Sequence, residues 1–302
     1  MDIDQLNKDY GIVDQLKFIL GNGSLPMILI SNKSAKALIS LYGGQVLSFQ
    51  PMGEYEDLLF LSKNAYYNGK KAIRGGIPVC WPWFGQDPKG LLRPNHGFAR
   101  NSFWAVTETE ASTDFKTKIK LRLIQTAENR YLWPHSFDLI LAITIGSTLN
   151  LELVTRNTGD KSFSITQALH SYFRIGDIER VKVLGLEENE YLDKLDDAKQ
   201  KKQMGAVTFL EEVDRIYSGV QSQLNIEDSI IKRRICITSL GNNTAVLWNP
   251  WAKTSKKMPD LEANGYKRFV CVEACNAATD VIEISPGSKY SLLTNFKILR
   301  EE

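Results

Sequence analysis

The sequence has almost no excess of charge of either sign and no long apolar run. Its 37 lysine and arginine residues nearly balance 35 aspartate and glutamate residues, so the formal net charge is only +2. Such a chain has no global field that would attract nucleic acid or a membrane surface. No apolar stretch approaches the roughly 18 residues of a membrane-spanning helix, and residues 1–4 lack the pattern of a signal peptide. We therefore expect a cytoplasmic protein that binds neither nucleic acid nor a membrane.

Cysteine and histidine are also scarce, with four and three residues respectively. Cys271 and Cys275 would share one face of a strand, but four residues along a strand separate them by about 13 Å, too far to hold one ion. No second cysteine pair and no histidine cluster in the sequence completes a zinc set. We expect buried, reduced thiols and no metal site.

Several common catalytic signatures are missing. The sequence contains no nucleotide-binding glycine loop and no dinucleotide fingerprint, since Gly75 and Gly76 precede Pro78 rather than a helix. No serine stands in a nucleophile-elbow motif. The chemistry is therefore expected to need no redox cofactor, and no cofactor is predicted.

What the sequence does contain is a series of short alternating segments. Residues 137–145, 149–153 and 163–169 alternate apolar with less apolar side chains, and turn residues separate them. Similar runs occur at 27–31, 37–41, 45–50, 118–123, 181–184, 234–240, 245–248 and 269–273. Strands spaced in this way predict an all-β, antiparallel β-sandwich.

Helical patterns are few, and we expect only two short helices, at 3–10 and 193–202. No internal repeat, low-complexity linker or composition boundary divides the chain. We therefore expect residues 1–302 to form a single domain, and a monomer is the default expectation.

His170 ends the alternating segment that begins near residue 162. The odd-numbered positions from 163 to 169 are mostly apolar and suit a core. The even-numbered positions are small and polar up to His170, and Tyr172 would follow on the same face. This pattern predicts that His170 faces a polar cleft. The alternative is a structural histidine.

Glu273 shares one face of the 269–273 segment with Cys271 and Cys275. A carboxylate in such a half-buried strand is costly unless it has a partner. Partial burial would raise its pKa, as a general base near neutral pH requires. The alternative is a salt bridge to a neighbouring strand.

Two further segments could bind an anion or a sugar. Residues 71–85 combine Arg74, paired glycines that would let the backbone approach a ligand, and aromatic side chains that either stack on a sugar or pack a loop. Residues 96–100 place Arg100 beside His96 and Gly97. Each arginine alone fits a structural ion pair, whereas two guanidinium groups together could clamp a phosphate. Asp214 could accept sugar hydroxyls, although its local pattern favours a turn.

At these positions the sequence resembles the aldose 1-epimerase (mutarotase) superfamily, and more narrowly its glucose-6-phosphate 1-epimerase branch. The matching blocks, in family order, are IRGGIPVCWPWFG (73–85), HGFAR (96–100), ALHSYF (168–173), DRIY (214–217), WNP (248–250) and FVCVE (269–273).

The resemblance implies a galactose-mutarotase-like β-sandwich with a concave sugar-binding face. The family's catalytic pair would be His170 and Glu273, and its substrate contacts would fall on Arg74, Asn95, His96, Arg100 and Asp214. It also implies a phosphorylated sugar as the substrate. The expected reaction interconverts the anomers of a hexose 6-phosphate by acid–base opening and closure of the ring.

Three other functions stay open at this point. The chain could be a mutarotase of free aldoses, or a non-catalytic carbohydrate-binding module on the same scaffold. A glycoside hydrolase is less favoured, because it usually needs two carboxylates that flank the scissile bond and only Glu273 is well placed.

Overall fold

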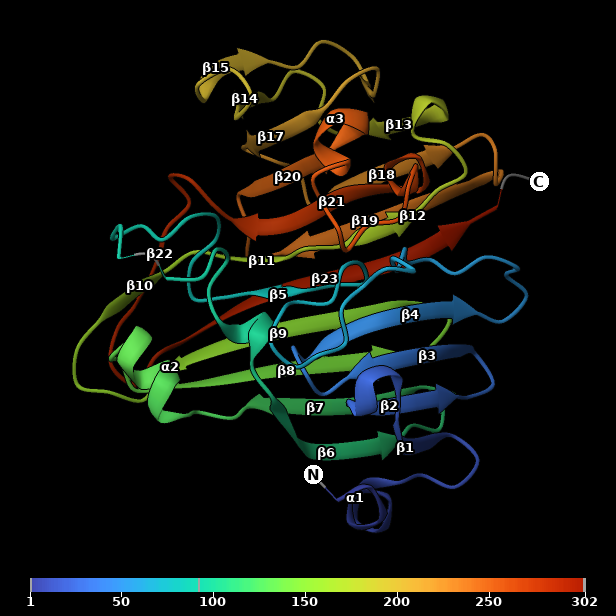
Figure 1. Cartoon of the computed structure of the whole chain (residues 1–302), viewed down its shortest axis with the longest axis vertical. Coiled ribbons are helices and arrows are strands. Elements are labelled where there is room, and N and C mark those ends of the chain that lie inside the picture. The colour runs from blue at the N-terminus through green and yellow to red at the C-terminus, as the bar shows by residue number, and fades with distance from the viewer. Residues whose placement is uncertain (1, 92, 301–302) are drawn as a thin grey trace.

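The computed structural model describes residues 2–91 and 93–300, and three sheets of at least four strands account for most of it (Figure 1). The nine-stranded antiparallel sheet contains, from edge to edge, β16 (Val207–Thr208), β13 (Val181–Leu184), β18 (Gln223–Asp228), β19 (Arg233–Leu240), β23 (Lys289–Leu299), β9 (Leu149–Asn157), β8 (Phe137–Ile145), β7 (Thr117–Leu123) and β6 (Trp104–Ala111).

The eight-stranded sheet carries the candidate site. Its path is β15 (Lys199–Lys202), β14 (Glu190–Asp193), β17 (Val213–Ser218), β20 (Thr244–Asn249), β21 (Phe269–Asn276), β11 (Gln167–Leu169) and β5 (Val79–Cys80), and β12 (Tyr172–Arg174) also pairs with β21.

The remaining elements are smaller. The four-stranded sheet contains β1 (Leu16–Leu20), β2 (Pro26–Ser31), β3 (Ala35–Ser40) and β4 (Gln45–Pro51), and β10 (Phe163–Ile165) pairs with β22 (Ile282–Ile284). The helices are α1 (Ile3–Tyr10), α2 (Ala127–Leu132) and α3 (Trp251–Ser255), and the 3-10 helices are η1 (Asn22–Ser24), η2 (Ala99–Asn101), η3 (Ile178–Arg180) and η4 (Gly265–Arg268). None of the helices in the described part of the chain is both long and apolar enough to cross a bilayer.

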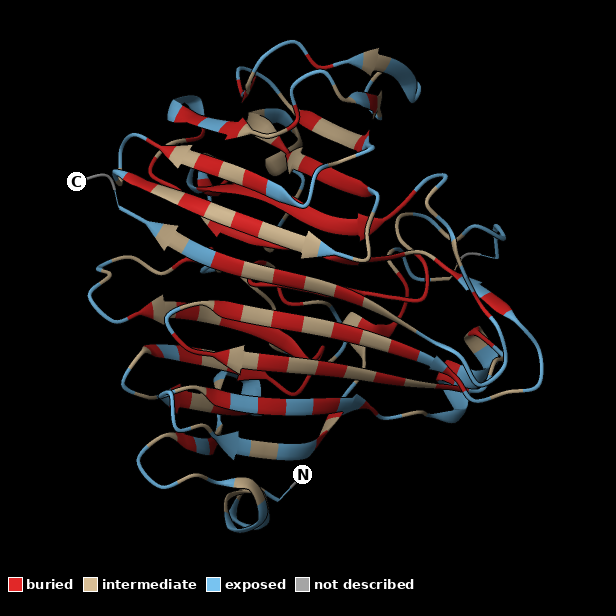
Figure 2. Ribbon diagram, turned by 180° about the vertical axis from the view of Figure 1, so that it is seen from behind, coloured by how far each residue is buried: buried red, intermediate tan, exposed pale blue. Residues whose placement is uncertain are grey.

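The sheets form two layers around one large apolar core. Strand β3 packs against β8, and β21 packs against β23, so the four- and eight-stranded sheets cover one face of the nine-stranded sheet. Seen from behind, the long strands of that sheet carry alternating buried and intermediate bands (Figure 2). In β8 and β9 this alternation runs the whole length of each strand, because residues at positions i and i+2 of a strand point to the same face. The predicted antiparallel sandwich is confirmed.

The alternating sequence pattern located about half of the strands in the described residues and missed the longest, β23. Residues 193–202 are not a helix, and that prediction was wrong. They form the antiparallel hairpin of β14 and β15, in which Asp193 lies opposite Lys199. Lys201 forms ion pairs with Asp193 and Asp196 across the turn. Asp197 and Ala198 have positive φ angles of 50° and 55°, a conformation that a helix does not accommodate.

Of two further expectations, the N-terminal helix is confirmed and the turn at Asp214 is wrong. Helix α1 is present as predicted, and the Asp2 side chain caps it by accepting hydrogen bonds from the backbone of Asp4 and Gln5. Asp214 lies within strand β17 rather than in a turn. The single domain over residues 1–302 stays a prediction, although one core cluster includes both Leu16 and Phe296.

Candidate active site

Strand β21 is buried on both faces, which is how a carboxylate comes to lie inside this protein. Val270, Val272 and Ala274 face the main core. The opposite face carries Cys271, Glu273 and Cys275, as the alternation predicted, and Glu273 is only 1% exposed. A buried carboxylate is costly, so its surroundings indicate what it does.

His170 lies opposite Glu273, at a break in the neighbouring ladder. Leu169 of β11 pairs with Ala274, and Tyr172 of β12 pairs with Cys271. The same register on both sides of the break places His170 across from Glu273. The backbone N–H of His170 donates to the carbonyl of Pro78 at 3.0 Å, which fixes the chain there.

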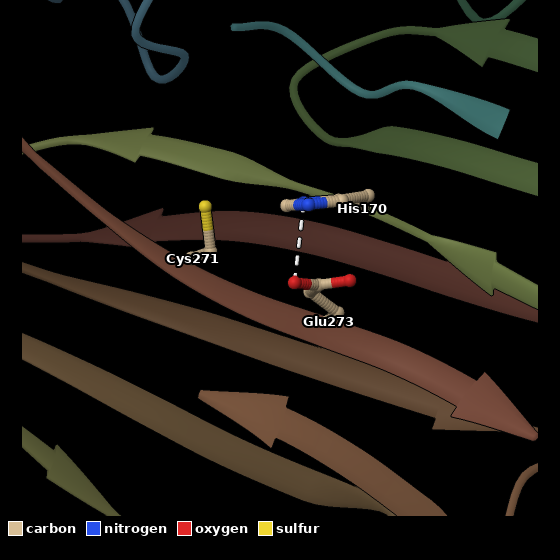
Figure 3. A group of neighbouring side chains, drawn as sticks. All are labelled: His170, Cys271 and Glu273. Carbon is tan, nitrogen blue, oxygen red and sulfur yellow. Dashed lines mark ion pairs between the residues drawn. The ribbon is translucent and has the colours of Figure 1, made fainter. Parts of the chain in front are cut away.

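The two side chains meet. His170 Nδ1 lies 3.2 Å from Glu273 Oε1, within ion-pair distance (Figure 3). This contact is not a hydrogen bond, and Nδ1 of His170 is buried without a hydrogen-bond partner. The other carboxylate oxygen, Oε2 of Glu273, is also buried without a partner. Buried polar atoms without a partner are few in native proteins, so each of these two calls for an explanation.

Burial shifts both groups away from their charged forms. It is the main cause that lowers the pKa of His170 well below its ordinary value, and the neighbouring His96, Arg100 and Arg74 act in the same direction. Burial likewise raises the pKa of Glu273 well above its ordinary value, and Asp214 adds to this while Arg100 opposes it. The pair therefore tends to hold one proton in total, which leaves one acid and one base in contact.

Arg100, on η2, is the arginine beside this pair that has no acidic partner in the described part of the chain. Its Nη2 donates to the carbonyl of Asn95 at 2.9 Å, and its Nε is buried without a partner. Within residues 2–91 and 93–300, no carboxylate lies at ion-pair distance from Arg100. Its charge nevertheless acts on both His170 and Glu273. An anion bound beside the pair would find a free guanidinium here.

Arg74 differs, because it already has an acidic partner. Its Nη2 lies 3.0 Å from Asp260 Oδ2 and its Nε donates to the same oxygen at 3.1 Å. Its Nη1 donates to the hydroxyl of Tyr172 at 2.9 Å. The ion pair that the sequence left open as an alternative is therefore present for Arg74, and the two arginines are not equivalent.

His96 is positioned by a tight backbone contact next to it. A Cβ on Gly97 would lie 1.9 Å from the carbonyl oxygen of Trp81, so only glycine fits at this position. The His96 ring packs on Phe84 at 4.8 Å between centroids and lies 5.8 Å from His170. Burial, with the positive charge of Arg100 and Lys194, lowers the pKa of His96 to about 3. His96 is therefore neutral at physiological pH.

Asp214 and Asn95 are the other two residues that were expected to contact the substrate. Directly opposite residues share a face of an antiparallel sheet, so the pairing of Asp214 with Trp248, and of Trp248 with Cys271, places Asp214 on the same face as Glu273. Burial raises the pKa of Asp214, and Lys194 opposes that shift. Asn95 is exposed, and its carbonyl, rather than its side chain, contacts Arg100.

The structure also corrects the interpretation of the glycine-rich segment. A Cβ on Gly76 would lie 2.3 Å from the carbonyl oxygen of Val46, so the close approach is to the protein's own backbone and not to a ligand. Trp81 and Trp83 are buried in the core, as the packing alternative predicted, whereas Phe84 contacts His96.

Three contributors to this site escaped the sequence analysis. Trp248 places its ring 6.0 Å from His170, Asp260 holds Arg74, and Lys194 acts electrostatically on His96 and Asp214. Trp248 continues an apolar alternating run, so its pattern is that of a core residue. Asp260 and Lys194 have no periodic signal, because they reach the site through loops.

Comparison with known proteins now assigns the chain to a family. The family model described as aldose 1-epimerase matches residues 26–297. The chain belongs to the aldose 1-epimerase family. This membership makes it an epimerase, and the function expected from the sequence resemblance is confirmed at that level.

Individual relatives support the same family assignment for this epimerase. A protein of Escherichia coli (strain K12), provisionally assigned as a glucose-6-phosphate 1-epimerase, is 36% identical over 271 residues, which cover 88% of this chain and 90% of that protein. A protein of Cenchrus ciliaris with the same provisional assignment is 38% identical over 278 residues, covering 89% and 83%. The crystal structure of a provisionally assigned mutarotase from Salmonella typhimurium superposes with a TM-score of 0.90 at 33% identity, covering 97% of this chain and 96% of that one. The mutarotase-like fold is thus confirmed.

Proposed function

We propose that this epimerase interconverts the α and β anomers of a hexose 6-phosphate, with glucose 6-phosphate as the first candidate. The observation that carries the proposal is the contact of His170 with Glu273 at 3.2 Å, beside an Arg100 whose buried Nε has no partner. The first feature supplies an acid and a base, and the second supplies a cation for the phosphate.

The reaction uses the single proton of the pair, which burial favours on Glu273 and which first moves to His170, leaving a carboxylate and an imidazolium. Glu273 takes the proton from the C1 hydroxyl while His170 gives a proton to the ring oxygen, and the C1–O5 bond breaks to give the open aldehyde. Rotation about C1–C2 presents the other face of the aldehyde. Closure reverses both transfers, so each turnover leaves the proton count of the pair unchanged. After closure Glu273 is again ionised and His170 protonated, and return of that proton from His170 to Glu273 restores the resting pair.

The other side chains would bind the sugar and orient C1 between the pair. Arg100 would hold the 6-phosphate, and a charge-assisted guanidinium contact suits this anion. Arg74 would assist only with the N–H groups that Asp260 leaves available. Asp214 would accept hydrogen bonds from sugar hydroxyls, and His96, which is neutral, could donate or accept one. Asn95 would contribute at the edge of the site.

The test is anomer exchange measured by NMR saturation transfer on glucose 6-phosphate and on glucose. The wild-type protein should accelerate exchange of the phosphorylated sugar. Arg100→Ala should raise KM for glucose 6-phosphate about 10- to 100-fold, because a hydrogen bond to a charged group is worth roughly 1.5–3 kcal/mol. KM for glucose should change much less, although loss of the Arg100 charge also acts on His170 and Glu273. Arg122→Ala is the matched control, since Arg122 is an exposed arginine paired with Asp138. No acceleration of glucose 6-phosphate exchange by wild type would refute the proposal.

A free aldose is the second candidate substrate. The ion pair between Arg74 and Asp260 favours it, because one of the two arginines is already neutralised. Equal acceleration of glucose and glucose 6-phosphate, with no effect of Arg100→Ala on either, would establish this alternative. The monomeric state and the cytoplasmic location stay predictions.

A further inference from the structure

One side chain beside the catalytic pair has no part in the proposed reaction. Cys271 lies two positions before Glu273 on the same face of β21 and is fully buried. Figure 3 shows its sulfur on the same side of the strand as the Glu273 carboxylate and the His170 ring. A nitrogen, a sulfur and an oxygen donor of these three residues all lie within 4.8 Å of one another.

We propose that His170, Cys271 and Glu273 form a binding site for a soft divalent cation of the zinc type, and that the bound cation inhibits the epimerase. Imidazole, thiolate and carboxylate are the three ligand types that zinc uses in proteins, at about 2.0–2.3 Å. Ligand atoms of a tetrahedral zinc site lie roughly 3.5 Å apart at those bond lengths. The separation of 3.2 Å between Nδ1 of His170 and Oε1 of Glu273 already fits this spacing. All three ligand atoms lie within 4.8 Å of one another, so the Cys271 sulfur would have to move by no more than about 1 Å.

Two unsatisfied atoms within the cluster also point to a ligand. Nδ1 of His170 and Oε2 of Glu273 are buried without any hydrogen-bond partner, and these residues are only 7% and 1% exposed. Such atoms are costly to bury unpaired. A cation would satisfy Nδ1 directly, and it would satisfy Oε2 where the carboxylate binds through that oxygen or through both. The fourth coordination position would then remain for water, as in zinc sites with three protein ligands.

The donor set also makes the site selective. Magnesium and calcium prefer oxygen ligands and gain little from a thiolate or an imidazole, so they should not bind. The nearby charge of Arg100 opposes any cation, while Asp214 favours one. This combination has no local sequence pattern, because His170 lies about a hundred residues from Cys271 along the chain.

Metal binding itself does not depend on the proposed function, whereas inhibition rests on it. A cation held by His170 and Glu273 would occupy the acid and the base together, and neither could then exchange a proton with the sugar. Zinc should therefore block anomer exchange without competing for the phosphate position.

The binding test uses Co²⁺ as a spectroscopic probe of the intact protein, with Cys236→Ser as the control because Cys236 is the thiol that is not fully buried. We expect one equivalent of Co²⁺ to bind with a thiolate-to-cobalt absorption band, which zinc displaces and magnesium does not. Cys271→Ser should abolish the band and Cys236→Ser should retain it. Cys271→Ala repeats the test if the serine variant does not fold. Absence of the band in wild type, or its persistence without Cys271, would overturn the site.

The inhibition test measures the zinc concentration that halves the rate of each variant relative to its own rate without zinc. That concentration should rise at least tenfold in Cys271→Ser and stay constant in Cys236→Ser. Equal sensitivity of both variants would overturn the inhibitory role. If wild type binds Co²⁺ through Cys271 but does not accelerate anomer exchange, the metal site stands and the proposed function fails.

Discussion

The ring of Tyr172 lies flat against the imidazole of His170, with centroids 4.8 Å apart and planes within 10° of parallel. The same tyrosine accepts a hydrogen bond from Arg74, which in turn pairs with Asp260. A continuous set of contacts therefore runs from the loop that carries Asp260 to the proposed catalytic histidine. Tyr172 is buried at 2% exposure, so this stacking holds the imidazole plane in place.

The stacking and the hydroxyl of Tyr172 can be separated by mutation. Tyr172→Phe keeps the ring and loses one hydrogen bond, which costs about 1 kcal/mol, so we expect a change in kcat or KM below roughly tenfold. Tyr172→Ala removes the stack and should lower kcat by about 10- to 100-fold, because a misplaced acid loses its orientation. Both constants can be measured from the concentration dependence of anomer exchange. Equal losses in the two variants would show that the hydroxyl, and not the ring, positions His170.

Asp260 should compete with an anionic substrate for Arg74. Asp260→Asn removes the negative charge and frees the guanidinium, so we expect the inhibition constant of inorganic phosphate to fall about 3- to 10-fold, in keeping with a partly exposed ion pair. KM for glucose 6-phosphate should fall in parallel while that for glucose stays constant. Asp138→Asn, at a surface ion pair with Arg122, is the matched control. Weaker phosphate binding in Asp260→Asn would mean that the carboxylate positions Arg74 instead of competing for it.

Gly76 should not tolerate a side chain, for steric reasons. Its φ is +62° and a Cβ would lie 2.3 Å from the Val46 carbonyl oxygen, so Gly76→Ala should lower the free energy of unfolding by more than about 2 kcal/mol. Gly53→Ala measures the cost of a positive φ without a steric clash, because Gly53 has a φ of +88° and no atom lies within 4 Å of the position its Cβ would take. Its cost should be near 1 kcal/mol. Urea unfolding of both variants measures the difference, and equal costs would remove the steric argument.

Asp57 should make stability depend on pH. Its carboxylate accepts hydrogen bonds from the backbone of Phe49 and Leu59 and from Ser48. Burial nevertheless raises its pKa above 3.8, so the folded state holds a proton that the unfolded state has lost. The stabilising contribution of protonated Asp57 is therefore fully present below pH 3.8, its ordinary pKa. This contribution is lost as pH rises through the pKa of Asp57 in the folded state.

Asp57→Asn should remove this dependence while it keeps the acceptor oxygen. Urea unfolding of both proteins between pH 4 and 7 should show wild type losing stability relative to the variant as pH rises, by about 1.4 kcal/mol for each unit by which the pKa is raised. A constant difference, or wild type gaining relative stability with pH, would contradict this account.

Much of the fold could be predicted because its long strands have one face in the core. The regular alternation of residues 137–145 appears unchanged in β8, and the shared face of His170 and Tyr172 was correctly inferred. Strand β6 was missed, because its charged half, with Glu108 and Glu110 on the surface, has no apolar period. Residues 193–202, which belong to the hairpin of β14 and β15, were mistaken for a helix because cross-strand ion pairs, and not apolar side chains, hold this hairpin together.

The sequence indicated which residues form the candidate site but not which of them contact one another. Arg74 and Arg100 looked alike in the sequence, and only the fold brings Asp260 to one of them. The contact between His170 and Glu273 depends on a break between β11 and β12 that no local pattern encodes. Cys271 similarly looked like a core thiol, because the histidine beside it belongs to another strand.

The most direct test of the central claim is saturation transfer between the anomers of glucose 6-phosphate with wild type, His170→Ala and Glu273→Gln. Acid–base catalysis by a positioned pair contributes roughly 10²- to 10⁴-fold. The account predicts clear acceleration by wild type and a loss of at least 100-fold in either variant, with the fold and the affinity for inorganic phosphate retained. Acceleration that survives in both variants would contradict it, because the exchange would then not depend on His170 and Glu273.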